Sequence, residues 1–340
     1  MARFGAGLSD HVPGLIDMPR LTILICTHDR AHLLCKTLAS LNAARRPSGW
    51  SVDILVAANA CRDGTHAALD MLRSRSSDAG NLPLTWFAEP MPGKSNALNS
   101  ALPRVDSDVV ALVDDDHRVD AGYIEAICRA ADDHPDADLF CGRILPDWDG
   151  TEPGWVHDSG PYRIYPLPVP RFDQGDVGRE LTPDVAVPGG GNLFLRTAWA
   201  ERIGPFATDM GPTGHDLGGA EDLDWVLRAL RMGARLRYVP DMVQYHYVDA
   251  DRLTLHYLMK KAYVRTASTV RLEPHKAHGR VPKYLYRKIA EYALQACTAF
   301  SRSRRRFYLV RTAAALGEFA GHRQQGRALP SGSTLPPVGP

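Results

Sequence analysis

An uninterrupted apolar run, Val109–Val113, followed at once by Asp114-Asp115-Asp116, constrains the fold more than any other feature of this sequence. Such a run suits a strand of a parallel sheet covered on both faces, and open α/β sheets bind ligands beyond the carboxyl ends of their strands. Three adjacent carboxylates repel one another unless a cation compensates. The triplet therefore predicts a hard-metal site, in which Mg²⁺ or Mn²⁺ bridges carboxylates and a phosphorylated ligand. A solvated acidic turn is the alternative.

Strand-like and helix-like segments alternate through the first half of the chain. After the first apolar run, Leu33, Leu34, Leu38 and Leu41 recur at helical spacing. This alternation predicts βαβ units and an α/β fold with a Rossmann-like, mainly parallel central sheet flanked by helices. The expected strands cover residues 21–27, 52–58, 84–88, 109–113 and 139–144, and the expected helices cover residues 31–43, 65–72, 93–102 and 121–131.

Residues 146–188 break this rhythm with eight prolines and several aromatic residues, which favours an ordered binding loop. Order resumes at Gly189-Gly190-Gly191-Asn192 and a strand over 193–196. A helix over Glu221–Met232 should end at Gly233. Short strands are expected over 236–239 and 243–247, then helices near 253–270, 283–299 and 307–322, and a tail over 324–340 whose Gly, Ser and Pro content predicts disorder.

Composition indicates an ordinary globular protein: 340 residues, 44% hydrophobic and 23% charged, enough for one large core or two smaller ones. The six cysteines show no Cys-x-x-Cys pair, so neither a zinc site nor a disulfide framework is indicated. No apolar stretch approaches the roughly 18 residues of a membrane-spanning helix. Residues 1–19 lack the layout of a secretion signal, and we expect a flexible N-terminus and a cytoplasmic location.

The net charge of +1 hides an asymmetry. Residues 251–340 contain 17 Lys and Arg against 4 Asp and Glu, a balance of +13, which leaves −12 for residues 1–250. Basic amphipathic helices with interleaved tyrosines suit an anionic membrane surface, whereas helices that cover the sheet and expose cations are the equal alternative. Nucleic acid would also attract this charge, but no nucleic-acid motif accompanies it, so none is expected as a partner.

Two further features carry potential chemistry. Glu221-Asp222 follows Gly218-Gly219 at the first turn of the expected helix, where acids commonly serve only to stabilise the helix dipole. His246 lies in an alternating strand, on the face opposite Tyr245 and Tyr247. A single histidine of this kind is more often a satisfied core residue than a ligand, so neither feature is specific by itself.

Taken in order from about Leu21 to Tyr247, these segments resemble the inverting, nucleotide-sugar-dependent glycosyltransferases of family 2, which have the GT-A fold. Each short motif is weak alone, and their shared order and spacing carry the resemblance. The matching segments are Cys26–Arg30, Asn59–Thr65, Gly93–Asn99, Asp114–Asp116, Gly189–Asn192, Glu221-Asp222 and His246.

The resemblance implies a catalytic mechanism. Asp116, with His246 and Asp114, would hold Mn²⁺ or Mg²⁺ and neutralise the departing diphosphate. Asp222 would act as the base that activates an acceptor hydroxyl, and Glu221 would orient the acceptor. One in-line displacement would invert the anomeric carbon of the sugar.

The resemblance also implies the donor-binding residues. Gly190 and Gly191 would let the backbone approach the donor closely. Lys94 and Arg30 would contact its phosphates, with solvated surface charges as the alternative. The implied donor-binding set is Thr27, His28, Asp29, Arg30, Asn59, Asp63, Lys94, Asn96, Asp114, Asp115, Gly190 and Gly191.

One departure from the family concerns the nucleobase. Where many relatives carry an acid that reads the base, this chain has Ala57-Ala58, so the base is not identified. Among other functions, a sugar nucleotidyltransferase should have a glycine- and arginine-rich loop after the first strand, where Cys26–Arg30 has no glycine. A non-catalytic nucleotide-sugar-binding protein should lack the metal and base candidates. A dinucleotide oxidoreductase should have Gly-x-Gly-x-x-Gly there.

The expected organisation and partners follow from this resemblance. Residues 20–250 would form the catalytic domain, with a nucleotide-binding half over 20–117 and an acceptor-side half over 118–250 that includes the loop 146–188. Residues 251–323 would form a basic helical extension. The partners would be a nucleoside diphosphate sugar and a saccharide or lipid-linked acceptor, with peripheral contact to an anionic membrane and self-association through the extension both compatible with the sequence.

Overall fold

The structure is a computed structural model that describes residues 18–75, 80–208, 221–272 and 281–328, without the side chains of 268, 269, 271, 272 and 324–328. The predicted turn Gly218-Gly219 and most of the predicted flexible ends lie outside these residues. Contacts divide the chain into two units. The first, residues 1–145 and 171–246, contains most of the predicted catalytic domain and is named the catalytic unit after that prediction; the second, the helical unit, comprises residues 146–170 and 247–340.

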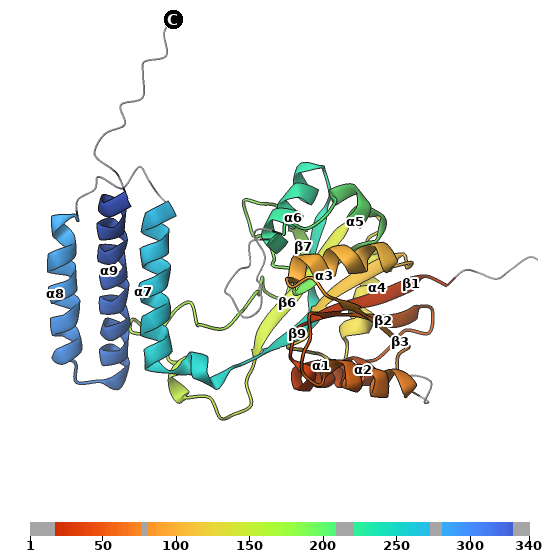
Figure 1. Cartoon of the computed structure of the whole chain (residues 1–340), viewed down its shortest axis with the longest axis horizontal. Helices are drawn as coiled ribbons and strands as arrows, with labels where there is room; N and C mark the ends of the chain where they lie inside the picture. The colour runs from red at the N-terminus through yellow and green to blue at the C-terminus, as the bar shows by residue number, and fades with distance from the viewer. Residues whose placement is uncertain (1–17, 76–79, 209–220, 273–280, 329–340) are drawn as a thin grey trace, which may run out of the picture. The chain divides into compact units, whose positions relative to one another are not determined.

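The catalytic unit is built on a nine-stranded sheet in the order β3-β2-β1-β4-β8-β6-β9-β5, with β7 paired to β9 (Figure 1). The first four strands in this order are parallel, whereas β8 runs antiparallel to β4. The predicted α/β fold with a mainly parallel sheet is confirmed. The strands are β1 Arg20–Thr27, β2 Ser51–Asn59, β3 Leu84–Glu89, β4 Val109–Asp114, β5 His117–Val119, β6 Leu139–Asp147, β7 Arg179–Leu181, β8 Asn192–Arg196 and β9 Leu236–Tyr247.

Helices cover both faces of this sheet, which explains why its central strands are apolar throughout. On one face, Leu34, Leu38 and Leu41 pack into a core shared with α2 and α4. On the other face, α3, α5 and α6 bury Trp199 and Trp225. The helices are α1 Ala31–Ala43, α2 Thr65–Ser74, α3 Lys94–Ala101, α4 Tyr123–Asp133, α5 Ala198–Ile203 and α6 Glu221–Arg231, with a 3₁₀ turn over Leu102–Arg104.

Four parts of the catalytic unit differ from the sequence-based expectation, and two of them are β7 and α5, neither of which was predicted. The strands expected over 236–239 and 243–247 form one strand, β9, which runs through Pro240. Pro240 lies in the gap between the two expected strands and cannot donate a ladder hydrogen bond. The very short β5 was not predicted, because three residues carry too little periodicity to be recognised.

The helical unit consists of α7 Leu255–Leu272, α8 Lys283–Cys297 and α9 Arg302–Ala328, with 3₁₀ turns over Gly154–His157 and Ala250–Leu253. The predicted helical extension is therefore present. The first part of the proline-rich segment, residues 146–170, belongs to this unit, where Tyr162 lies against Phe307. The boundary predicted between extension and tail falls inside α9.

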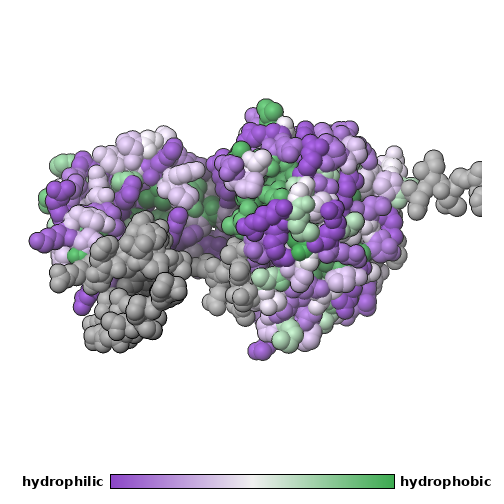
Figure 2. All heavy atoms as spheres, turned by 90° about the horizontal axis from the view of Figure 1, so that it is seen from above, coloured by the Kyte–Doolittle hydropathy of each residue, from purple (hydrophilic) through white to green (hydrophobic). Residues whose placement is uncertain are grey.

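Helices α7 and α9 approach each other closely because α9 carries glycines at the contact. A Cβ at Gly317 would lie 2.1 Å from the Tyr263 carbonyl oxygen, and one at Gly321 would lie 2.8 Å from that of Ala267. Hydrophilic residues dominate the visible surface of each unit (Figure 2). Within the described part of the chain, no helix combines the length and the apolar character needed to cross a bilayer.

Candidate active site

The acidic triplet lies at the carboxyl end of β4, where the sequence predicted it, and two cations compensate its charge. Arg30 Nη1 lies 3.1 Å from Asp115 Oδ1 and 2.9 Å from Asp116 Oδ2. Lys94 Nζ lies 2.8 Å from Asp114 Oδ1. The repulsion expected among three adjacent carboxylates is therefore relieved from two sides, by one residue after β1 and one at the start of α3.

Asp115 is the most deeply buried member of the triplet, at 5% exposure. Its Oδ2 accepts a hydrogen bond from Thr27 Oγ1 at 2.7 Å, and its carbonyl oxygen accepts one from Thr37 Oγ1 at 2.9 Å. Burial and the neighbouring Asp116 charge raise the pKa of Asp115 to about 6, although Arg30 opposes this shift. Asp115 thus anchors the turn between β4 and β5.

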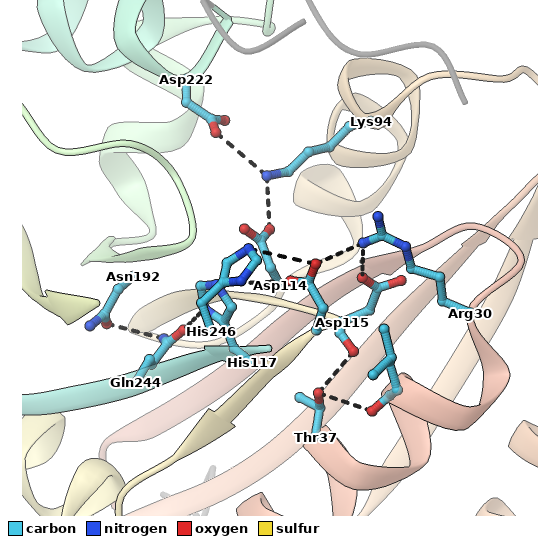
Figure 3. Close-up of polar contacts among 12 residues, drawn as sticks. Arg30, Thr37, Lys94, Asp114, Asp115, His117, Asn192, Asp222, Gln244 and His246 are labelled. Atoms are coloured by element: carbon cyan, nitrogen blue, oxygen red, sulfur yellow. Dashed lines mark hydrogen bonds and ion pairs between the residues drawn. The ribbon is translucent and has the colours of Figure 1, made fainter. Parts of the chain in front are cut away.

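Lys94 joins the triplet to the second acidic feature (Figure 3). Its ammonium lies between Asp114 and Asp222, 3.5 Å from Asp222 Oδ2. Burial disfavours both charges, but the attraction between Asp114 and Lys94 prevails: the pKa of Asp114 lies below its ordinary range and that of Lys94 well above. The strand tip and the start of α6 therefore face one shared space.

The glycine loop lies against both of these carboxylates. A Cβ at Gly190 would lie 2.5 Å from Asp222 Cγ, and one at Gly191 would lie 2.5 Å from Asp114 Oδ2. No real Cβ approaches so closely, so only glycine lets this backbone pass beside the acids. Gly189, by contrast, has no described atom within 4 Å of a Cβ position, apart from its own chain neighbours.

Glu221 and Asp222 occupy the first turn of α6. Glu221 is only 1% exposed, and burial together with the neighbouring Asp222 charge raises its pKa. Among the described residues, Glu221 Oε2 and Asp222 Oδ1 are buried without a hydrogen-bond partner. Buried polar oxygens normally have a hydrogen-bond partner, so stabilisation of the helix dipole does not by itself account for these two.

Three residues could hold a cation. Ligand atoms of Asp116, His117 and His246 all lie within 4.8 Å of one another. His246 Nε2 is 3.7 Å from Asp116 Oδ2, and His117 Nε2 is 3.9 Å from Asp116 Oδ1. The sequence analysis predicted Asp116 and His246 as metal ligands but not His117, which directly follows the triplet. It missed His117 because β5 was not recognised as the strand that pairs with β9.

The predicted donor-binding residues after β1 and β2 gather at the same sheet edge, where they build the loops. Asn59 accepts a hydrogen bond from the Gly93 amide at 2.8 Å, and its carbonyl oxygen lies 2.7 Å from His28 Nδ1. Asp29 Oδ1 accepts a hydrogen bond from the Asp63 amide at 3.1 Å. These contacts shape the rim of the site. The remaining member of the set, Asn96, donates to the Pro92 carbonyl oxygen at 2.8 Å.

A Rossmann-like sheet whose acidic strand tip faces a second carboxylate beside a glycine loop is the architecture of the GT-A glycosyltransferases. The profile of glycosyl transferase family 2 matches residues 22–204, and the chain belongs to that family. It is an enzyme of the glycosyltransferase class. Family membership sets aside the oxidoreductase, nucleotidyltransferase and non-catalytic alternatives.

Individual relatives agree with this assignment. The chain is 25% identical over 260 residues, 76% of its length and 77% of the relative, to the succinoglycan biosynthesis protein ExoM of Rhizobium meliloti strain 1021. Its fold is similar to that of S. aureus TarS 1–349 in complex with UDP, with a TM-score of 0.52, 15% identity and coverage of 91% and 90%. It is also similar to the mannosyltransferase PcManGT of Pyrobaculum calidifontis in complex with GDP-Man and Mn²⁺, with a TM-score of 0.53, 19% identity and coverage of 88% and 87%.

Proposed function

We propose that this enzyme transfers a sugar from a nucleoside diphosphate sugar to an acceptor hydroxyl in one metal-dependent, inverting displacement. The observation that carries the proposal is the placement of Asp222 and the acidic triplet on one space, bridged by Lys94. An inverting transfer needs a base on one side of the sugar and positive charge beside the leaving group on the other. This arrangement offers both.

The base is Asp222. Its buried Oδ1 has no partner among the described residues, so it can accept the acceptor proton without first breaking a hydrogen bond there. Asp222→Asn keeps the size and the contact with Lys94 but cannot take a proton, so turnover should fall about 10²–10⁴-fold. Glu221, on the same helical turn, orients the acceptor. Wild-type turnover in purified Asp222→Asn would show that the base lies elsewhere.

Asp116 and His246 fit a divalent cation, since a carboxylate oxygen and an imidazole nitrogen are both metal donors and lie 3.7 Å apart. A bound cation supplies positive charge that stabilises the diphosphate leaving group. Asp114, the other predicted ligand, would have to release Lys94 to join them. Chelation with EDTA should abolish turnover, and Mn²⁺ or Mg²⁺ should restore it; turnover that persists in chelator would remove the cation from the proposal.

Lys94 and Arg30 face the donor phosphates in this proposal, because both cations are held at the acidic edge where the diphosphate would lie. The relatives bind different bases, UDP in TarS and GDP-Man in PcManGT. A thermal-shift screen of UDP- and GDP-linked sugars, each with and without Mn²⁺, would identify the donor because a ligand that binds the folded state raises its stability. If neither the UDP-linked nor the GDP-linked sugars raise the melting temperature, the proposed donor class is contradicted.

The acceptor is proposed to be a saccharide or a lipid-linked saccharide, in line with the polysaccharide pathway in the name of ExoM. The turn between α8 and α9 suits peripheral contact with an anionic membrane: Phe300 is fully exposed there, and Leu294, in the last turn of α8, is 62% exposed. Arg302 and Arg305, in the first turn of α9, are also exposed. Aromatic and basic side chains together favour an anionic lipid interface.

Vesicle flotation tests the membrane contact. The full chain should float with vesicles that contain anionic lipid and detach as salt is raised, because each exposed Arg near the surface contributes about 1 kcal/mol. Arg302→Glu with Arg305→Glu should abolish flotation. Arg75, exposed in the catalytic unit, offers a matched control, and Arg75→Glu should float like wild type. If wild type and both variants float equally, or if none of them floats, the turn between α8 and α9 is not a membrane-binding surface.

A further inference from the structure

Four buried side chains behind the carboxylates form one hydrogen-bonded network that ends on His117. His117, Asn192 and Gln244 are each no more than 2% exposed, and Tyr123 is fully buried. The register of β5 and β9 places His117 opposite His246, and Gln244 lies two residues before His246 on the same face of β9. In a network this deeply buried every donor needs an acceptor, so the direction of each bond can be derived.

Asn192 sets the direction. Its Nδ2 lies 2.8 Å from the Arg143 carbonyl oxygen and 3.0 Å from that of Met242. Only the nitrogen of an amide can donate to two carbonyl groups, so Asn192 Oδ1 must face the opposite way. There it accepts hydrogen bonds from Gln244 Nε2 at 3.1 Å and from the Tyr123 hydroxyl at 3.2 Å.

Asn192 in turn fixes Gln244 (Figure 3). Because Gln244 Nε2 donates to Asn192 and, at 2.6 Å, to the Tyr123 hydroxyl, its Oε1 is the atom that meets His117 Nδ1. An amide oxygen can only accept, so His117 Nδ1 carries the proton. In the neutral ring, Nε2 then bears a lone pair. This Nε2 is buried and has no hydrogen-bond partner in the described part of the chain.

The lone pair lies beside the proposed cation ligands. The distances of 3.9 Å from His117 Nε2 and 3.7 Å from His246 Nε2 to the Asp116 oxygens are too long for hydrogen bonds. Two atoms that bind one ion at about 2.1 Å each are themselves about 3–4 Å apart. We propose that His117 is a third protein ligand of this cation and that Gln244 is a positioning residue that holds the Nε2 lone pair toward it. The inference rests on the proposed metal-dependent function.

This ligand set determines the class of metal. Two imidazoles and one carboxylate form a set that favours first-row transition ions, whereas Mg²⁺ takes oxygen ligands and keeps several waters. The sequence left Mg²⁺ and Mn²⁺ equivalent. With His117 included, the site selects Mn²⁺ over Mg²⁺, and His117 is the residue that creates the difference.

Metal affinity in the absence of donor tests the ligand. Binding of Mn²⁺ to the full chain removes the EPR signal of the free ion, and Mg²⁺ serves as competitor. His117→Asn keeps a donor toward Gln244 but has no atom at the Nε2 position. We expect it, and Gln244→Met, to weaken Mn²⁺ binding about 10–100-fold, with Mg²⁺ binding much less affected. Ser107→Ala removes a buried hydroxyl that donates to the Val109 carbonyl oxygen outside this network, and it should bind Mn²⁺ like wild type.

Histidine ¹⁵N NMR of the metal-free wild-type enzyme reads the tautomer without any substitution. The His117 signals, identified by their absence from His117→Asn, should show the proton on Nδ1. A proton on Nε2 would overturn the positioning role. This measurement stays decisive even if Gln244→Met fails to fold, which thermal unfolding of each variant would reveal.

Asp116→Asn separates failure of this inference from failure of the proposed function. If Asp116→Asn loses Mn²⁺ binding while His117→Asn and Gln244→Met keep it, the third ligand is wrong and metal-dependent transfer stands. If all three variants bind Mn²⁺ like wild type, the cation site itself is wrong. The inference is supported if all three variants lose Mn²⁺ binding and the affinity for Mg²⁺, measured by competition, changes least in His117→Asn.

Discussion

At the edge of the catalytic unit the Lys94–Asp114 pair is partly open to solvent, but Asp115, His117 and Glu221 beside it are each at most 5% exposed. Among the described residues of the helical unit, the acids that pair with Lys or Arg are all at least 20% exposed. In the Lys288–Glu318 pair the side chains are 35% and 20% exposed. Buried charges need fixed partners, while half-exposed pairs contribute little and tolerate change. The catalytic unit therefore holds its polar groups in one geometry, and the helical unit owes its structure to packing.

Glycine also has different roles in the two units. Gly190 and Gly191 give room to the carboxylates of the proposed active site, and Gly317 and Gly321 give room to the backbone of a neighbouring helix. Substitution at the first pair should therefore affect activity, and substitution at the second pair should affect stability. The following predictions test this contrast.

Gly191→Ala should reduce turnover by about 10²-fold, because displacement of catalytic groups by an ångström is enough for such a loss. The new Cβ would lie 2.5 Å from Asp114 Oδ2 and must push the loop or the carboxylate aside. Steady-state kinetics measure the effect. Gly189→Ala is the matched control, since its Cβ would meet no atom of the described residues within 4 Å, and it should retain wild-type turnover. Equal activity of both variants would break the proposed contrast.

Gly317→Ala should destabilise the packing of α7 against α9 by about 1–3 kcal/mol, the usual cost of overpacking. Its Cβ would lie 2.1 Å from the Tyr263 carbonyl oxygen. Hydrogen exchange should show faster exchange in these helices, with the donor-induced thermal shift of the catalytic unit retained. Leu316→Ala, at a position 43% exposed on the same helix, should change little. Loss of donor binding in Gly317→Ala would contradict the separation of roles.

Glu318→Gln should cost about 0.5–1 kcal/mol of stability at pH 7, as expected for a partly exposed pair. Burial alone would raise the pKa of Glu318, but hydrogen bonds from Lys288 and Tyr284 lower it below the ordinary 4.5. A lowered folded-state pKa contributes stability above pH 4.5 that is lost as pH falls through the folded pKa. The difference between variant and wild type in chemical denaturation should therefore shrink in acid. A constant difference would rule out this ionisation.

Phe300→Ala should have the smallest effect on folding, within about 0.5 kcal/mol, since a fully exposed side chain loses no packing. Its effect should appear only in vesicle flotation, where anionic-lipid binding should weaken. Thermal unfolding and flotation on the same preparation distinguish the two. A large loss of stability would show that Phe300 is a structural residue.

The sequence predicted the parts of this protein that depend on local pattern. The apolar strand ending in Asp114–Asp116, the alternation that gives β1 to β4, and the acidic helix start at Glu221 are all readable from short segments. Each depends on the period of its own residues and on the rule that ligands lie beyond strand ends. The predicted metal, base and donor roles remain predictions.

The hydrogen-bonded network that ends on His117 could not be predicted from local pattern. Gln244 lies 127 positions from His117 and Asn192 lies 52 from Gln244. No periodicity connects such residues, because only the pairing of β5 with β9 and the placement of β8 and β9 on either side of β6 bring them together. The three-residue β5 also gave too short a pattern to reveal that pairing.

The sequence by itself determined the fold class and the position of the acidic strand tip, because strand burial acts on neighbouring residues. Only the tertiary structure decided that Lys94 bridges Asp114 and Asp222, that residues 146–170 belong with the helices, and that a buried amide orients His117. Those outcomes depend on hydrogen bonds and charges between distant segments, whose energies exist only once the backbone has brought the partners out of water and into contact.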